Sequence, residues 1–310
     1  MTDPTHATHA THATHATHAT RATDTAPGSV ATLHERCCLT LVRRLAALLD
    51  RDPAALREGD ALPRGWHPLL FNAPTPQAQL RSDGAAQLGV SWPDIGLPRL
   101  MLGGREARFG ADVPIGALLR RESRCGPVQF KQGRSGRFAL VTVEHQIFID
   151  GASAPALTER LGYILRPAST EPATAPATAL ASAPAPAPPV PDVAPTPVLA
   201  QRRIVPDERL LFRYSALTDN PHRIHYDAAY AKAAEGYPAL VVNGSIAGLF
   251  LLEMLRTAAG REPAVLVSRN VAPMFCGQPL DLCVGRDAQG WRLWAHNALG
   301  QTTFDARAEF

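Results

Sequence analysis

Residues 216–227, with the sequence ALTDNPHRIHYD, gather side chains that can accept and donate protons. The segment holds two histidines and two aspartates around an Asn-Pro pair, whereas the other histidines of the chain are mostly scattered or belong to a repeat. A histidine ring has a pKa near 6.5, so either ring could exchange a proton at physiological pH. Asn-Pro also begins many turns. The segment is therefore a candidate for proton transfer, for a turn, or for both.

His222, His225 and Asp227 form an H-x-x-H-x-D pattern that suggests a metal site. Such sites usually place two histidines four residues apart on a helix, whereas the proline before this pair favours an irregular turn. Asp227 precedes a short helical pattern and suits the N-cap of that helix, where it would help to position His225. We therefore expect no metal here.

A glycine opens an apolar helix further along the chain. Residues 243–260, NGSIAGLFLLEMLRTAAG, are apolar on nearly every face, so this helix must be surrounded by protein. Gly244 stands at its N-terminus, where free backbone N–H groups and the helix dipole attract negative charge. Asn243 could add an amide donor or cap the helix. Close packing or a turn would require the same glycine.

Shifts in composition divide the 310-residue chain into four parts. Residues 1–26 carry a His/Thr/Ala repeat with almost nothing to bury, so we predict a disordered tail. Residues 167–198 are almost entirely Pro, Ala, Ser and Thr and predict an extended linker. The remaining parts, residues 27–166 and 199–310, are each long enough for a domain with its own core.

Both domains show patterns of antiparallel sheet and buried helix. In the first, residues 39–49 have the spacing of an amphipathic helix, and residues 136–150 and 160–166 read as neighbouring antiparallel strands. In the second, four strand-like runs follow the apolar helix: AVLVSRNVA, LDLCVG, WRLWAH and TTFDARAEF. A sheet wrapped around one buried helix is the simplest packing of such elements.

The overall composition excludes several classes of protein. The net charge of +3, from 31 basic and 28 acidic residues, is too balanced for a nucleic-acid-binding protein, and no apolar run is long enough for a membrane span. The five cysteines are odd in number and lack CxxC spacing, which favours reduced thiols in the core. We expect a cytoplasmic protein whose partners are small molecules or proteins.

Taken together, the HRIHYD turn, the glycine-led helix and the closing strands resemble the MaoC-like or hydratase 2 family, whose usual pattern is D-x-N-P-[IL]-H-x-D. In the first domain, WHPLLF, GLPRLMLGG and FKQGRSGRFALVTVEHQI resemble the mesaconyl-CoA or itaconyl-CoA hydratase subgroup. The resemblance covers nearly everything outside the tail and linker. It implies an α+β double hot-dog fold, with two antiparallel sheets each wrapped on a helix. The second domain would be catalytic and the first would form part of the pocket.

The resemblance implies reversible hydration of an α,β-unsaturated acyl-CoA thioester of the mesaconyl-, itaconyl- or 3-hydroxyacyl-CoA type. His225 would transfer the proton, and the Gly244 N–H would polarise the thioester carbonyl. An alignment without gaps puts Asn220 where the wider family carries its catalytic carboxylate. A neutral amide cannot abstract a proton, although it can hold water. Asp219, one residue away, is the competing candidate, and which of the two orients the water stays open.

The same resemblance implies substrate contacts and no cofactor beyond the coenzyme A of the substrate. Lys131 and Arg134 could meet its phosphates, and Asn243 could contact the acyl thioester. A homodimer is compatible with this interpretation. Two alternatives stay open: a hot-dog acyl-CoA thioesterase, which would attack the carbonyl carbon, and a non-catalytic acyl-CoA-binding module, which the missing carboxylate makes conceivable.

Overall fold

The structure is a computed structural model that describes residues 29–72, 74–86, 90, 95–133, 136–167 and 196–310. The predicted disordered tail, residues 1–26, lies outside the described residues, as do Arg134 and residues 168–195 of the predicted linker.

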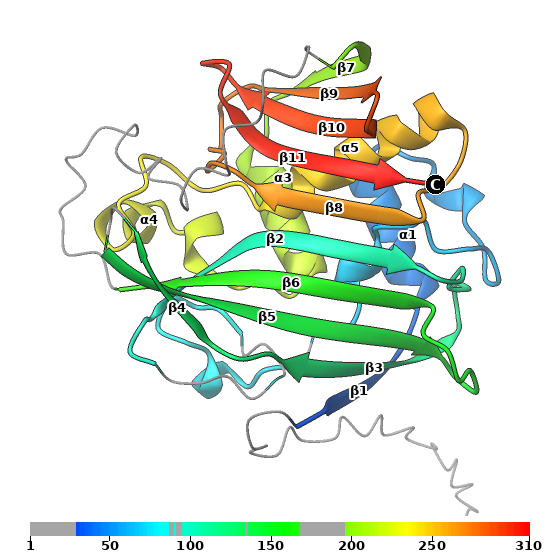
Figure 1. The fold of residues 1–310 in the computed structure, drawn as a ribbon, viewed down its shortest axis with the longest axis horizontal. Coiled ribbons are helices and arrows are strands. Elements are labelled where there is room, and N and C mark those ends of the chain that lie inside the picture. The colour runs from blue at the N-terminus through cyan, green and yellow to red at the C-terminus, as the bar shows by residue number, and fades with distance from the viewer. Residues whose placement is uncertain (1–28, 73, 87–89, 91–94, 134–135, 168–195) are drawn as a thin grey trace, which may run out of the picture.

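The strands form one antiparallel sheet in which the two predicted sheets are joined edge to edge (Figure 1). Their order is β1-β3-β5-β6-β2-β8-β11-β10-β9-β7, and β4 pairs with β5 beside this path. The first half of the chain contributes β1 (Ala31–Arg36), β2 (Arg99–Phe109), β3 (Leu118–Cys125), β4 (Gln129–Gly133), β5 (Gly136–Ile149) and β6 (Leu157–Arg166). The second half contributes β7 (Val198–Ile204), β8 (Val265–Asn270), β9 (Leu280–Asp287), β10 (Gly290–Asn297) and β11 (Thr302–Glu309).

Strands β2 and β8 make the junction between the halves. They pair antiparallel from Gly104 opposite Arg269 to Arg108 opposite Val265. The junction is an ordinary backbone ladder, so the hydrogen bonds of the sheet continue from one half into the other.

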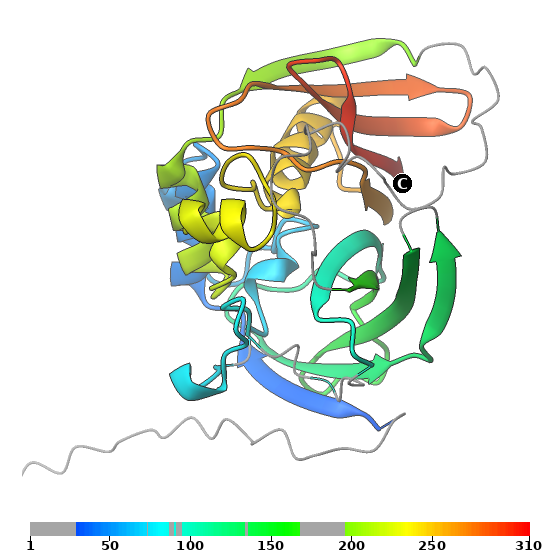
Figure 2. The same ribbon diagram turned by 90° about the vertical axis from the view of Figure 1, so that its left-hand side faces the viewer.

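The helices lie on the concave side of the curved sheet (Figure 2). They are α1 (Leu39–Leu48), α3 (Glu208–Leu217), α4 (Ala228–Ala233) and α5 (Gly244–Ala259), with short 3-10 turns η1 (Pro53–Ala55), η2 (His67–Leu69), η3 (Gln77–Gln79) and η4 (Arg223–His225). Helix α5 is apolar on most faces because it is enclosed by the sheet and by the other half of the protein. Among the described helices, none is long and apolar enough to cross a membrane.

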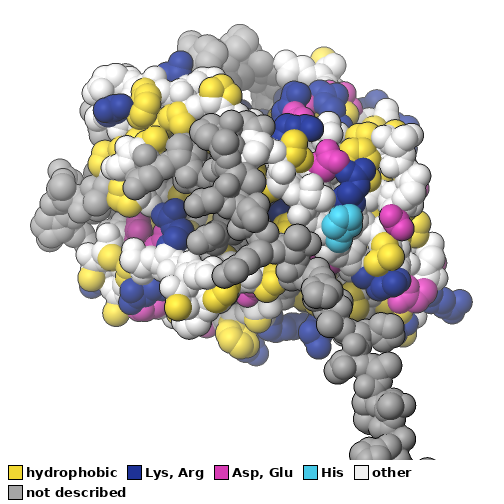
Figure 3. All heavy atoms as spheres, turned by 90° about the horizontal axis from the view of Figure 1, so that it is seen from below, with side chains coloured by type: hydrophobic (Ala, Val, Ile, Leu, Met, Phe, Trp, Pro, Cys, Tyr) yellow, Lys and Arg dark blue, Asp and Glu magenta, His cyan; other side chains and the backbone are white. Residues whose placement is uncertain are grey.

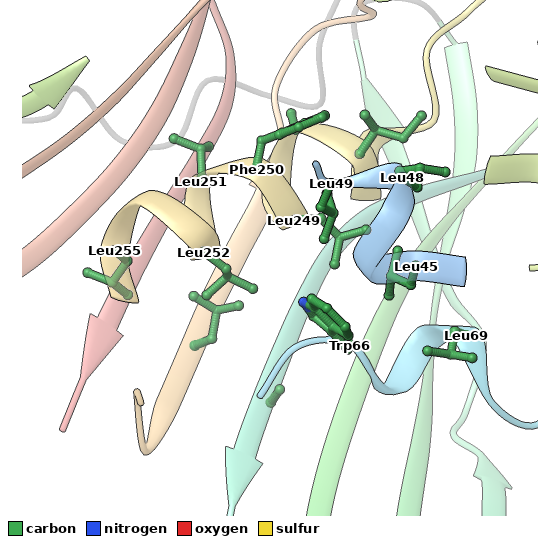
Figure 4. Packing of buried hydrophobic residues seen from close by; sticks show 14 of the residues in the cluster. Leu45, Leu48, Leu49, Trp66, Leu69, Leu249, Phe250, Leu251, Leu252 and Leu255 are labelled. Atoms are coloured by element: carbon green, nitrogen blue, oxygen red, sulfur yellow. The ribbon is translucent and has the colours of Figure 1, made fainter. Parts of the chain in front are cut away.

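One hydrophobic core runs through both halves (Figure 4). Leu45 of α1 and Leu49, which directly follows this helix, lie beside the fully buried ring of Trp66, which faces Leu252 of α5. The indole Nε1 of Trp66 also donates a hydrogen bond of 2.9 Å to Glu253 Oε1 on α5. Burial of large apolar side chains across this boundary stabilises the halves against each other.

The predicted helices and strands are confirmed, and the end of the predicted linker is corrected. Val198 is the first residue of β7, which pairs with β9, and Thr196 is buried with its Oγ1 2.8 Å from Asp287 Oδ2. The sequence did not predict the start of β7, because this edge strand follows directly on the Pro/Ala-rich segment, is mostly exposed and lacks an apolar face.

The surface carries both signs of charge. On the described part of the face seen in Figure 3, basic and acidic side chains lie next to one another. The mixture of charges on this face agrees with the balanced composition of the chain.

Candidate active site

A cavity of about 510 Å³ lies between the two halves of the protein. Strands β2, β5 and β6 form one wall, and the segment before η4, the start of α5 and the end of β8 form another. The walls bring together residues from the first half (His67, Arg99, Arg105, Arg121, His145, Glu159, Tyr163, Arg166) and from the second half (Asp219, Asn220, His222, His225, Asn243, Gly244, Asn270). A concave site shared between two halves is a common place for a ligand.

The end of helix α3 fixes where the HRIHYD segment begins. Asp219 adopts a left-handed conformation with φ of 45°, and the N–H of Asn220 donates to Ser215 O at 2.9 Å. This is the Schellman arrangement that ends many helices, and aspartate is one of the few residues besides glycine that tolerate it. The Asp219 side chain borders the cavity but is exposed. Its local role is therefore that of a helix-terminating residue.

His225 is buried on η4, and its protonation is set by a backbone carbonyl. Its Nδ1 lies 2.7 Å from Val241 O. A carbonyl only accepts hydrogen bonds, so Nδ1 carries the proton and Nε2 keeps a free lone pair. Burial lowers the pKa of His225, which outweighs the opposing effect of the Val241 carbonyl. The ring is therefore neutral at physiological pH and able to accept a proton through Nε2.

Asn220 and His222 lie between helix α3 and His225. Asn220 Oδ1 accepts a long hydrogen bond of 3.3 Å from the His222 backbone N–H. The His222 ring meets the His225 ring edge to face with 5.7 Å between centroids, and burial lowers the pKa of His222 to about 4. His222 is thus an uncharged neighbour that packs against His225.

Gly244 is the first residue of α5, and its backbone is tightly surrounded. A side chain here would put its Cβ 2.3 Å from Asn270 Oδ1, so any other residue would force the Asn270 side chain to move. The predicted cap is confirmed, because Asn243 Oδ1 accepts from Ser245 N at 3.0 Å. The Gly244 N–H has no hydrogen-bond acceptor among the residues described, which leaves a donor at the positive end of the helix dipole.

Asp227 is the N-cap of α4, as predicted. Its Oδ1 accepts from Tyr230 N at 2.9 Å, and its Oδ2 lies 2.8 Å from Arg223 Nη2. Both carboxylate oxygens are thus used within the turn. The turn holds η4, and with it His225, in place.

Sequence reasoning missed Asn270, which joins the two halves at the cavity. Its Nδ2 donates to Leu102 O of β2 at 3.0 Å, while its buried Oδ1 has no hydrogen-bond partner in the described part of the chain. Asparagine is uncommon in strands, and its position near the end of a strand-like run was the available signal.

Sequence reasoning also missed a polar wall on the first half of the sheet. The carboxylate of Glu159 lies 2.8 Å from His67 Nε2 and 3.0 Å from Arg105 Nε, and His145 Nδ1 lies 2.8 Å from Ser123 Oγ. Burial opposes ionisation of Glu159, but Arg105 and His67 outweigh it and hold its pKa below the usual range. Burial lowers the pKa of His145 to about 4. His67 and His145 lie in motifs that carried the family resemblance, where neither was given a chemical role.

Of the two residues predicted to bind phosphate, only Lys131 is among the described residues, and it does not line the cavity. Lys131 is exposed on β4 and is absent from the described lining of the cavity, and Arg134 lies outside the described residues. Among the four described arginines that line the cavity, two lie side by side. Arg99 and Arg166 are cross-strand partners on β2 and β6, and Arg99 Nε lies 2.9 Å from Glu235 Oε2.

Comparisons with known proteins agree with this arrangement. Residues 65–276 match the family model described as hydroxyacyl-thioester dehydratase type 2. The mesaconyl-C(4)-CoA hydratase of Chloroflexus aurantiacus is 36% identical over 289 residues, which cover 91% of this chain and 95% of that protein. Among solved structures, HtdX of Mycobacterium tuberculosis superposes with a TM-score of 0.60 at 16% identity, covering 91% of this chain and 99% of its own. Another M. tuberculosis protein, described as a double hot-dog, gives a TM-score of 0.55 at 14% identity over 94% and 97% of the two chains. The expected double hot-dog fold is confirmed.

Proposed function

The chain belongs to the hydroxyacyl-thioester dehydratase type 2 family, and on this premise we propose how its cavity carries out the family's chemistry. The enzyme is a hydro-lyase that adds water across the double bond of an α,β-unsaturated acyl-CoA thioester and removes it in the reverse direction. The acyl thioester occupies the cavity between the halves, with its reacting carbons beside His225. Because of its relative's activity, mesaconyl-C(4)-CoA is a first candidate substrate, together with itaconyl-CoA and 3-hydroxyacyl-CoA.

His225 is the proton-transfer residue in this proposal. The observation that carries it is the 2.7 Å contact from Nδ1 to the Val241 carbonyl, which supports a neutral ring with a free Nε2. In the hydration direction Nε2 takes a proton from water as the water oxygen bonds to Cβ. The electrons of the double bond move to the thioester oxygen. The proton then passes from Nε2 to Cα, which restores the carbonyl and the neutral imidazole.

The Gly244 N–H stabilises the enolate oxygen that forms between these steps. It is an unoccupied donor at a helix N-terminus that lines the cavity, and it is held rigidly by the close approach of Asn270. Donors of this kind typically lower the barrier by about 3 to 4 kcal/mol. Any side chain at this position would displace Asn270, so glycine serves both the packing and the chemistry.

Asn220 orients the attacking water. Its amide lines the cavity near His222 and His225, and one weak hydrogen bond leaves it capacity for a water molecule. Asp219 is less suited, because its conformation is needed to end helix α3 and its side chain is exposed. Removing the proton then falls to His225 alone.

Arg99 and Arg166 are the proposed contacts for coenzyme A phosphates. They lie opposite each other on β2 and β6 and both line the cavity, and a guanidinium can bind a phosphate through two hydrogen bonds. Lys131 and Arg134 stay predictions for the same role.

A panel of thioesters tests the reaction. Crotonyl-CoA, mesaconyl-C(4)-CoA and itaconyl-CoA are each followed by loss of the enoyl absorbance and by release of free thiol. Loss of absorbance without thiol release supports hydration. Thiol release identifies a thioesterase, and tight binding with neither signal identifies a non-catalytic acyl-CoA-binding module.

A further inference from the structure

Arg121 is an arginine of the cavity wall that the proposed reaction does not use. It lies on β3 opposite Ile147 of β5, and both side chains line the cavity. Its guanidinium stacks over the ring of Phe71, 5.1 Å from the centroid. Its Nε is buried, and the side chain makes no hydrogen bond or ion pair with any residue that the structure describes.

The carboxylates near Arg121 are engaged elsewhere. Glu159 contacts His67 and Arg105 through the same oxygen, Oε1. Glu35 accepts a hydrogen bond from the Phe71 backbone N–H, and burial raises its pKa in spite of that bond. Both acids attract Arg121 from beyond ion-pair distance, and neither pairs with it.

Arg121 is half-buried, and its buried Nε has lost water without gaining a hydrogen-bond acceptor among the described residues, which is unfavourable for a charged group. Burial accordingly lowers the pKa of Arg121, although Glu159 and Glu35 act in the opposite direction. The neighbouring His145 is uncharged, and its Nδ1 contacts Ser123 Oγ at 2.8 Å. If the Ser123 hydroxyl donates to Nδ1, the neutral ring carries its proton on Nε2, which has no partner in the described ranges and can donate a hydrogen bond beside Arg121.

We propose that Arg121 and His145 form a subsite for a free carboxylate at the far end of the acyl group, so that the enzyme prefers dicarboxylic acyl-CoA substrates. This inference rests on the proposed function, because it needs an acyl thioester in the same cavity. A single guanidinium forms two parallel hydrogen bonds with one carboxylate and matches its charge.

The surroundings favour a carboxylate over a phosphate. Arg121 lies opposite the buried Ile147 and stacks on Phe71, and the nearby Arg105 is paired with Glu159, so a polyanion would find no unpaired second cation among these neighbours. The phosphates of coenzyme A are better served by Arg99 and Arg166, which face each other on β2 and β6. The cavity would then hold the two ends of the substrate with separate arginines.

Fumaryl-CoA and crotonyl-CoA form a matched pair for the test, because they differ only in a terminal carboxylate in place of a methyl group. The enzyme is compared with the variants Arg121→Gln and Arg121→Lys by measuring kcat/KM on both. Arg120→Gln is the control. Arg120 is the next residue of the same strand but stacks on Phe148, 4.2 Å from the ring centroid, pairs with Glu122 and does not line the cavity.

We expect Arg121→Gln to lower kcat/KM for fumaryl-CoA about 10- to 100-fold, the usual worth of hydrogen bonds to a charged group. The kcat/KM of this variant for crotonyl-CoA should change less than threefold, which would also show that the variant is folded. Arg121→Lys should keep part of the preference for fumaryl-CoA over crotonyl-CoA. Arg120→Gln should leave kcat/KM unchanged for both substrates. An equal loss on both substrates in Arg121→Gln, or no loss on either, overturns the subsite and leaves the hydratase function standing. A wild-type enzyme that hydrates neither these two thioesters nor mesaconyl-C(4)-CoA and itaconyl-CoA overturns the proposed function as well.

Discussion

Acid should destabilise this protein through His145, and the size of the effect follows from its burial. The pKa of His145 is about 4 in the folded protein, because burial disfavours the charged ring, against 6.5 for an exposed histidine. The unfolded chain therefore binds more protons than the folded protein between these two values. The contribution of the neutral His145 ring to the free energy of unfolding is therefore complete above pH 6.5. It is lost as the pH falls toward 4. Between pH 7 and pH 4.5 the loss is about 2 kcal/mol from this ring alone.

Urea denaturation of the wild type and of His145→Gln at pH 7 and pH 4.5 measures this contribution. Glutamine can keep a hydrogen bond to Ser123 Oγ but does not titrate. The variant should be less stable than the wild type at pH 7, yet lose about 2 kcal/mol less on acidification. His34→Gln removes an exposed histidine of β1 and serves as the control. An identical pH dependence in the wild type and His145→Gln would refute the reasoning.

Three further predictions concern the site and the chain. His225→Ala should lower kcat about a hundredfold or more, the usual contribution of a general acid or base, whereas His222→Ala should do far less; equal losses in steady-state kinetics would contradict the assignment. Asn220→Asp should preserve or raise kcat because it restores the wider family's carboxylate. Asp219→Asn should leave kcat near the wild-type value and change the free energy of unfolding by less than about 0.5 kcal/mol, since asparagine also tolerates the left-handed conformation. A folded but inactive Asp219→Asn enzyme would instead make Asp219 the base. Proteolysis within residues 167–198 should give two fragments that co-elute in gel filtration because they share the core around Trp66, and fragments that separate would contradict that core.

Local patterns in the sequence predicted most of the second half. The helix expected over residues 243–260 spans Gly244–Ala259, and the four strand-like runs after it are β8 to β11. The caps at Asp227 and Asn243 were also predictable, because they depend on a few neighbouring residues. Gly244 was singled out for its helix position, which the structure bears out. Its contact with Asn270 depends on a distant strand and was not predictable.

The polar wall of the cavity could not be predicted, for a physical reason. Arg121, His145 and Glu159 stand on different strands, and each looks in its own segment like a residue of a solvent-facing strand surface. Only the register of β3, β5 and β6 brings them to one face, as where His145 lies opposite both Ser123 and Glu159. A single sequence does not encode that register in any local pattern. The same holds for the β2–β8 junction, which pairs residues far apart in the chain.

The joining of both halves in one chain across β2 and β8 releases the protein from symmetry. In a pair of identical subunits every substitution appears twice, once on each side of the twofold axis. A mutation that improved one wall of a shared cavity would then alter its counterpart in the other cavity as well. Here each half accumulates changes independently. One half presents His225, Asn220 and the N-terminus of α5 to the cavity, while the other presents arginines and the buried Glu159.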